Sequence, residues 1–144
     1  MNALSQNVRA LVIDDDPPAR DQFVRLLKEE FGEEVQITLA GTLPEGEERL
    51  SASEFNLVIT DVDLGSGEAK FGGMHILSIL LGKGIPVLVV SGLPEREAID
   101  AKALEALSKR WAAFDYLGKP FDESHFKALV REAVTEREAA ERER

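Results

Sequence analysis

The stretch VRALVIDDD, residues 8–16, decides the fold of this chain, because an apolar run of strand length ends abruptly in three aspartates. Further apolar runs of similar length lie at residues 35–39, 55–60, 87–90 and 114–117. The segments 57–59 and 87–90 are apolar at consecutive positions, as central strands buried on both faces of a parallel sheet usually are. We therefore expect these two segments in the middle of a sheet.

Stretches with the apolar spacing of helices separate and follow these runs, and they begin near residues 17, 44, 73, 94 and 122. The first begins at Pro17-Pro18, where proline suits an initial helical turn, and ends at Gly32, a common terminating residue. Strict alternation of strands and helices predicts an α/β fold, a doubly wound five-stranded parallel sheet with helices on both faces.

The composition restricts the class of protein. The chain has 144 residues, enough for one domain, a formal net charge of −10 and no cysteine. An acidic chain lacks the clustered lysine and arginine that bind nucleic acid or anionic membrane. Residues 1–7 lack the basic start and long apolar stretch of a secretory signal, so we expect no leader, and no apolar run in the sequence approaches the length that crosses a bilayer. We predict a cytoplasmic protein that binds proteins, metal ions or small anions, without direct contact to nucleic acid or membrane.

Chemically capable residues occur where the predicted strands end. Asp14-Asp15-Asp16, Asp61, Ser91 and Lys119 follow four of the five runs. Since the carboxyl ends of parallel strands meet at one edge of a sheet, these side chains should share a crevice. Crowded carboxylates repel one another unless a positive charge lies among them. A hard divalent cation with oxygen ligands, first of all Mg²⁺, would supply that charge.

Each of these features also has an ordinary structural explanation. The aspartates of residues 14–16 would cap the helix that follows, and Asp61 and Ser91-Gly92 are common turn residues. Lys119 would be a surface lysine in a loop. Taken together, their positions at four strand ends favour a shared site.

The residues and their order resemble the receiver domain of two-component response regulators. The resemblance is carried by LVIDDDP (residues 11–17), LVITD (57–61), VLVVSG (87–92) and YLGKPF (116–121). It implies a flavodoxin-like sheet with strand order 2-1-3-4-5. It also implies that residues 1–134 form the receiver domain and that residues 135–144 form a charged helical extension, with no separate output domain in this chain.

The resemblance implies a phosphoryl-transfer site. Asp61 would be the phosphoacceptor and would take its phosphoryl group from a histidine of a sensor histidine kinase or a histidine phosphotransfer protein. Lys119 would pair with a phosphoryl oxygen, and Ser91 would donate a hydrogen bond to another. The bond between Lys119 and Pro120 is usually cis in the family. Self-phosphorylation and autodephosphorylation on Asp61 would be the only catalysis, so the chain would not be an enzyme in the usual sense.

The family's metal ligands map onto the acidic residues. Asp14 and Asp15 would hold Mg²⁺ together with Asp61 and the backbone carbonyl of Asp63. Asp16 occupies a position that is often acidic in the family but is less often a ligand. A register slip of one residue would replace Asp14 by Asp16, and the sequence leaves that alternative open.

The same resemblance implies a conformational switch. A new phosphoryl group would draw the Ser91 loop inward, and Tyr116 would turn inward with it. This change would reshape the face made by the fourth helix, the fifth strand and the fifth helix. That face would then bind an output protein, and a second copy of the chain is a further candidate partner.

The chain departs from the family pattern after Asp61. Residues 65–73 form a longer, glycine-rich loop, and Asp63 adds a carboxylate that we expect to alter metal affinity or the lifetime of the aspartyl phosphate. After Val134 the charges at Glu138 and Arg142 predict a solvated helix.

Two other functions are compatible with parts of the sequence. A receiver that acts as a docking module without phosphorylation would explain the altered loop. A phosphatase of the haloacid dehalogenase type would use Asp61 and Asp63 as its Asp-x-Asp pair. The phosphatase is disfavoured because that family carries the motif on its first strand.

Overall fold

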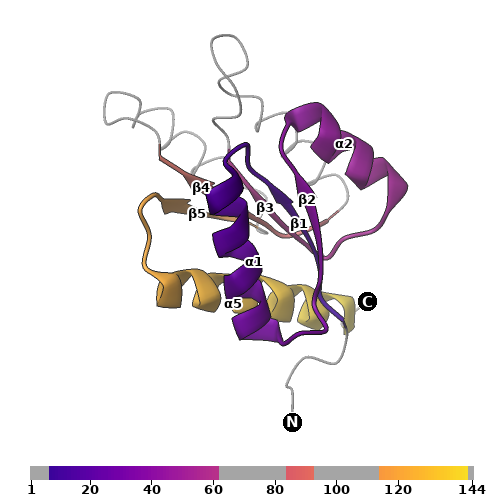
Figure 1. Ribbon diagram of the computed structural model, residues 1–144. Coiled ribbons are helices and arrows are strands. Elements are labelled where there is room, and N and C mark those ends of the chain that lie inside the picture. The colour runs from indigo at the N-terminus through magenta and orange to yellow at the C-terminus, as the bar shows by residue number, and fades with distance from the viewer. Residues whose placement is uncertain (1–6, 62–83, 93–113, 143–144) are drawn as a thin grey trace.

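The computed structural model describes residues 7–61, 84–92 and 114–142, in which five strands form one parallel sheet (Figure 1). The strands are β1 (Arg9–Ile13), β2 (Gln36–Ala40), β3 (Leu57–Thr60), β4 (Val87–Ser91) and β5 (Phe114–Gly118). They lie in the order β2-β1-β3-β4-β5, and every neighbouring pair is parallel. Both the predicted fold class and the strand order are confirmed.

Three helices lie within the described residues: α1 (Pro17–Phe31), α2 (Leu43–Ala52) and α5 (Glu123–Arg142). α1 has proline in its first turn and ends at Gly32, whose φ of 92° suits a residue without a side chain. At the start of α2, the Thr42 side chain accepts a hydrogen bond of 3.2 Å from the Glu45 amide. The helices expected near residues 73–82 and 94–107 lie outside the described residues.

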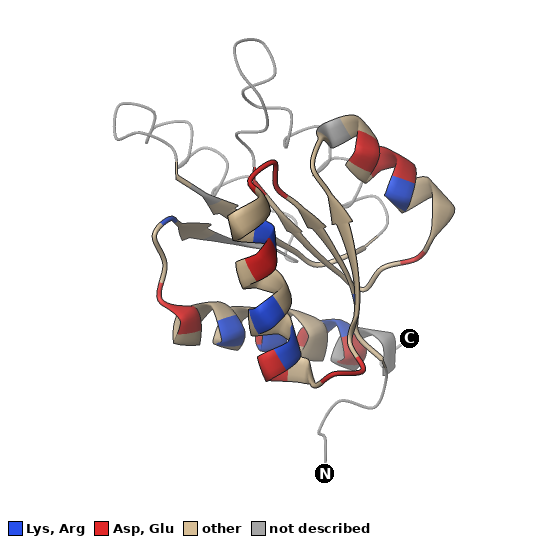
Figure 2. Cartoon of the chain, viewed as in Figure 1, with Lys and Arg blue, Asp and Glu red and all other residues tan. Residues whose placement is uncertain are grey.

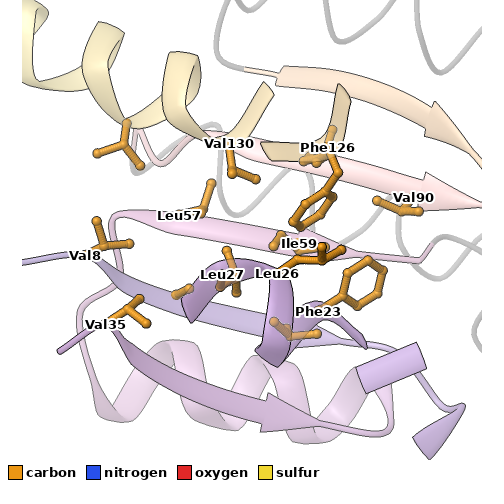
Figure 3. Packing of buried hydrophobic residues seen from close by; sticks show 14 of the residues in the cluster. Val8, Phe23, Leu26, Leu27, Val35, Leu57, Ile59, Val90, Phe126 and Val130 are labelled. Atoms are coloured by element: carbon orange, nitrogen blue, oxygen red, sulfur yellow. The ribbon is translucent and has the colours of Figure 1, made fainter. Parts of the chain in front are cut away.

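The main hydrophobic core lies between one face of the sheet and the pair of helices α1 and α5 (Figure 3). Alternate strand residues point into it, among them Ala10, Val12, Leu57, Ile59, Leu88 and Val90. The intervening residues point to the opposite face and are just as buried, including Leu11, Ile13, Val58 and Val89. α2 packs beside β1 and β2. Burial on both faces explains the unbroken apolar runs of β3 and β4.

Three phenylalanine rings join α1, α5 and the loop after β5. Phe23 of α1 stacks on Phe121 with ring centres 5.9 Å apart and an interplanar angle of 5°. Phe126 of α5 lies 5.5 Å from each of the other two rings. Because Phe121 follows Lys119 by two residues, this aromatic cluster fixes the segment that carries the lysine.

Opposite charges line the contact between α1 and α5 (Figure 2). Arg25 pairs with Glu29 on its own helix at 3.1 Å and with Glu123 on α5, and Lys127 pairs with Glu29 at 2.7 Å. Arg131 pairs with Glu30. Hydrogen bonds from these cations lower the pKa of both Glu29 and Glu123, the largest cause being Lys127 for Glu29 and Arg25 for Glu123.

This charged contact predicts a dependence of stability on acid. Since the pKa values of Glu29 and Glu123 are lower in the folded protein than the ordinary 4.5, their stabilising effect is present above pH 4.5 and is lost as the pH falls further. Substituting both residues with glutamine should therefore flatten the fall of the thermal unfolding midpoint below pH 4.5. Circular dichroism melts of wild type and E29Q/E123Q would measure it. Parallel curves for the two proteins would contradict the prediction.

The end of α5 differs from the expected solvated extension. The helix continues to Arg142, as predicted, but Glu138 is only 5% exposed. The adjacent Arg137 lines a groove of about 760 Å³ at the opposite edge of the sheet from Asp61, together with Arg9 and Asn56. The spacing of charged residues predicts that the side chains at the end of this helix are exposed to solvent. That prediction is wrong for Glu138. In the described part of the chain, none of the helices has the length and apolar character to cross a membrane.

Candidate functional site

Neighbouring strands hold Asp14 and Asp61 at the carboxyl edge of the sheet. The Asp14 amide donates to the Ala40 carbonyl at the end of β2, at 3.0 Å. The Asp61 amide donates to the Ile13 carbonyl at the end of β1, also at 3.0 Å. The β-ladder thus extends by one bond into each aspartate, which anchors the amide of each residue where its strand ends.

Lys119 joins these two aspartates. Its Nζ lies 2.8 Å from Asp14 Oδ2 and 3.1 Å from Asp61 Oδ2. The two aspartates are nearly inaccessible, with 1% and 8% of their surface exposed, whereas the lysine side chain is 26% exposed. Two buried carboxylates therefore share one ammonium group that reaches solvent. The strand ends meet as the sequence predicts, and the residues that directly follow β1, β3 and β5 are in contact.

The pKa of Lys119 reflects this position. Burial by itself lowers the pKa, but the hydrogen bond to Asp14 and the negative charges of Asp61 and Asp14 outweigh that effect. On balance the pKa is raised above the ordinary 10.5, so the side chain is an ammonium at neutral pH.

The three consecutive aspartates occupy different environments. Asp14 is buried against Lys119, while Asp15 and Asp16 are exposed. Asp16 is the N-cap residue of α1, and its amide donates to Asp14 Oδ1 at 2.9 Å. Figure 2 shows this acidic loop between β1 and α1. The structure thus brings Asp14 to the lysine and keeps Asp16 at the start of the helix.

Other predicted residues are placed only by their backbone or lie outside the described residues. Ser91 pairs with Gly118 and Tyr116 pairs with Val89 in the β4–β5 ladder. The side chains of Ser91 and Tyr116, and the whole of Asp63, fall outside what the structure describes. The Lys119–Pro120 peptide bond is cis, as the resemblance implied.

Gly92 lies against Lys119. A Cβ atom at position 92 would lie 3.4 Å from the Cβ of Lys119. The glycine is exposed. The absence of a side chain at this position keeps space open beside the lysine.

Arg20 is a neighbour of the site to which no sequence motif pointed. Its Nη1 donates a 2.8 Å hydrogen bond to the main-chain carbonyl of Asp14. In the sequence, Arg20 is recognisable only as a basic residue in the first turn of the helix that follows the acidic cluster. Such a cation is common on helices, so its spacing alone did not single it out.

The donor set is compatible with Mg²⁺. Asp14 and Asp61 offer buried carboxylate oxygens at one place, and oxygen is the ligand that Mg²⁺ prefers. Within residues 7–61, 84–92 and 114–142, no three His, Cys, Asp or Glu side chains are gathered closely enough to hold a metal ion. The further ligands implied for Asp15 and Asp63 stay a prediction.

A doubly wound sheet with buried aspartates at two strand ends and a lysine between them defines a class of α/β signalling domains. The family model for the response regulator receiver domain matches residues 10–131. The chain belongs to the response regulator receiver domain family. In the phosphatase alternative the acceptor follows the first strand, whereas Asp61 follows β3.

Curated relatives agree with this assignment. The chain is 31% identical over 124 residues to the sensory transduction protein LytT of Bacillus subtilis, covering 86% of this chain and 47% of that protein. It is 29% identical over 133 residues to the regulatory protein VirG of Rhizobium rhizogenes, covering 92% of this chain and 50% of VirG. The chain therefore spans about half the length of these relatives.

Solved structures share the fold. A CheY-like receiver domain protein from Methanospirillum hungatei has a TM-score of 0.72 at 22% identity, covering 94% of this chain and 99% of that one. The receiver domain of an HD domain-containing protein from Pseudomonas fluorescens has a TM-score of 0.75 at 21% identity, covering 100% and 98%. At these identities the likeness concerns the fold.

Proposed function

We propose that this chain is a phosphorylatable switch of a two-component system, with Asp61 as the phosphoacceptor. The observation that supports it best is the contact of Lys119 Nζ with the buried carboxylates of Asp14 and Asp61. A buried carboxylate beside an ammonium group, at the open edge of a parallel sheet, is suited to phosphoryl transfer, which depends mostly on positioning and charge neutralisation.

The proposed donor is a phosphohistidine on a sensor kinase or a phosphotransfer protein. A carboxylate oxygen of Asp61 forms a bond to phosphorus while the bond between phosphorus and the imidazole nitrogen breaks. The imidazole takes up the electron pair of that bond. Lys119 is close enough to Asp61 to offset negative charge on the transferred group.

Asp14 and Asp61 would hold the Mg²⁺ ion, with Asp15 and the backbone carbonyl of Asp63 as the further expected ligands. When bound, the ion neutralises charge on the phosphoryl oxygens. The Lys119 ammonium pairs with both carboxylates at 2.8 and 3.1 Å, so its positive charge offsets their negative charge in a buried place.

The output of the switch would be the face made by the fourth helix, β5 and α5. Ser91 and Tyr116 lie on the neighbouring strands β4 and β5, so a change at the hydroxyl has a short route to the aromatic residue. Phosphorylation adds negative charge and acceptor oxygens, which can draw in a hydroxyl donor. An output protein or a second copy of the chain would recognise the altered face. A cytoplasmic location stays a prediction.

Intact mass after incubation with Mg²⁺ and acetyl phosphate tests the proposal. We expect wild type to gain one phosphoryl group, in a reaction that requires Mg²⁺, and Asp61→Asn to gain none. Asp21→Asn, an exposed aspartate of α1, is the matched control and should react like wild type. An adduct on Asp61→Asn would refute the assignment of the acceptor. No adduct on wild type, with no binding of a beryllofluoride mimic, would favour the docking module.

A further inference from the structure

Arg20 ties helix α1 to the backbone of Asp14 on the acidic side of the site. It is half-buried on α1, and its Nη1 donates to the Asp14 carbonyl at 2.8 Å. The Asp14 side chain in turn accepts from Lys119 Nζ at 2.8 Å. Arg20 and Lys119 therefore both contact Asp14. The guanidinium binds its main-chain carbonyl, and the ammonium binds its carboxylate.

Gly41 leaves the space that this guanidinium occupies. A Cβ atom at position 41 would lie 2.7 Å from Arg20 Nη1, closer than real Cβ contacts allow. The Gly41 amide donates to Glu45 Oε1 at 2.6 Å, which ties the glycine to the first turn of α2. Among the described residues the glycines with positive φ are Gly32 and Gly84, so the backbone of Gly41 would accept alanine.

We propose that Arg20 is a positioning residue of the phosphoacceptor site and that Gly41 is needed because it leaves room for the guanidinium. The inference rests on the proposed function. Arg20 holds the backbone of Asp14 so that its carboxylate meets Lys119. A charged donor to a partly buried carbonyl makes a stronger hydrogen bond than a neutral one does. Outer contacts of this kind typically change metal affinity about tenfold or more.

Substitutions at both positions test the inference. Arg20→Met keeps an unbranched chain but removes the donor, and Gly41→Ala displaces the end of the Arg20 side chain. Each should raise the half-saturating Mg²⁺ concentration about tenfold and slow phosphorylation by acetyl phosphate similarly. Since Gly41→Ala acts through Arg20, the double variant should also show about tenfold, where independent effects would give roughly hundredfold. Arg20→Lys, which retains a charged donor, should recover part of the loss.

Controls separate positioning from a general loss of stability. Arg25→Met alters another arginine of α1, one that pairs with Glu29 and Glu123 away from the site. It should change the unfolding midpoint but not the half-saturating Mg²⁺ concentration. If Arg20→Met does the same, or if the two effects at positions 20 and 41 multiply, the inference is overturned.

Crystal structures of wild type and Arg20→Met give a reading that does not depend on the proposed function. We expect the contact between Asp14 Oδ2 and Lys119 Nζ, 2.8 Å here, to lengthen beyond hydrogen-bond range in the variant. If wild type takes no phosphoryl group, the proposed function fails. Independently of that result, this inference is overturned if the contact between Asp14 and Lys119 is unchanged in the variant crystal. If wild type reacts and the variant matches it, only the inference is lost.

Discussion

Lys119→Met should lower the free energy of unfolding by about 3 kcal/mol at neutral pH without added divalent cation, because removing one partner leaves buried charge uncompensated. The substitution removes the ammonium that contacts both Asp14 and Asp61, whose surfaces are 1% and 8% exposed. Urea unfolding followed by circular dichroism would measure the loss. We expect the smallest loss typical of buried ion pairs because the lysine side chain is partly exposed to solvent.

Two further variants test the cause of this effect. Lys127→Met removes an α5 lysine that pairs with the exposed Glu29, and it should destabilise the protein clearly less than Lys119→Met does. Adding Asp14→Asn to Lys119→Met removes one of the two facing negative charges, so the double variant should be more stable than Lys119→Met alone. Equal stability of the two would show that lost packing, rather than charge, explains the change.

The sign of the pH dependence follows from the raised pKa of Lys119. Its stabilising effect is fully present below pH 10.5 and is lost as the pH rises through the folded-state value. The difference in stability between wild type and Lys119→Met should therefore shrink above pH 10.5. If the difference in stability between the two proteins stayed constant above pH 10.5, the Lys119 ammonium would not be its cause.

Phe126→Ala should lower the free energy of unfolding by about 4 kcal/mol, since truncating a buried aromatic residue removes apolar contact and leaves a cavity. The Phe126 ring is fully buried and lies 5.5 Å from both Phe23 and Phe121. Figure 3 shows Phe126 and Phe23 in the core between the sheet and the helices. Urea unfolding should show an earlier midpoint with an unchanged slope.

Leu129→Ala on the same helix is the matched control for this core substitution. Leu129 is only partly buried against the core, so its truncation should cost clearly less than that of Phe126. Similar losses for the two variants would indicate that the helix as a whole, and not the aromatic cluster, determines the result.

The strands and the three described helices could be predicted from the sequence because the local patterns agree with the fold. Each strand pattern coincides with the ladder that forms, and Gly32 ends α1 where the sequence places it. The meeting of Asp14, Asp61 and Lys119 followed from topology, since parallel strands bring their carboxyl ends to one edge. These predictions needed no knowledge of side-chain direction.

The remaining details depend on contacts between segments distant in sequence. Three identical aspartates in a row cannot reveal which one faces the lysine; in the folded chain the Asp14 amide bonds to Ala40 and the Asp14 carboxylate meets Lys119. The long Arg20 side chain could reach many partners, and only the fold selects the Asp14 carbonyl. The burial of Glu138 likewise depends on where α5 lies over the sheet. The spacing of charges along a single helix gives no information about that position.

The contacts of the Phe121 ring with Phe23 and Phe126 couple the lysine to the folding of the whole domain. Local opening that released α5 would withdraw Phe126, loosen Phe121 and free the segment that carries Lys119. We therefore expect the site and the aromatic core to open together as one cooperative unit in native-state hydrogen exchange. A shortened chain that lacked α5 would lose the geometry of the site together with its core.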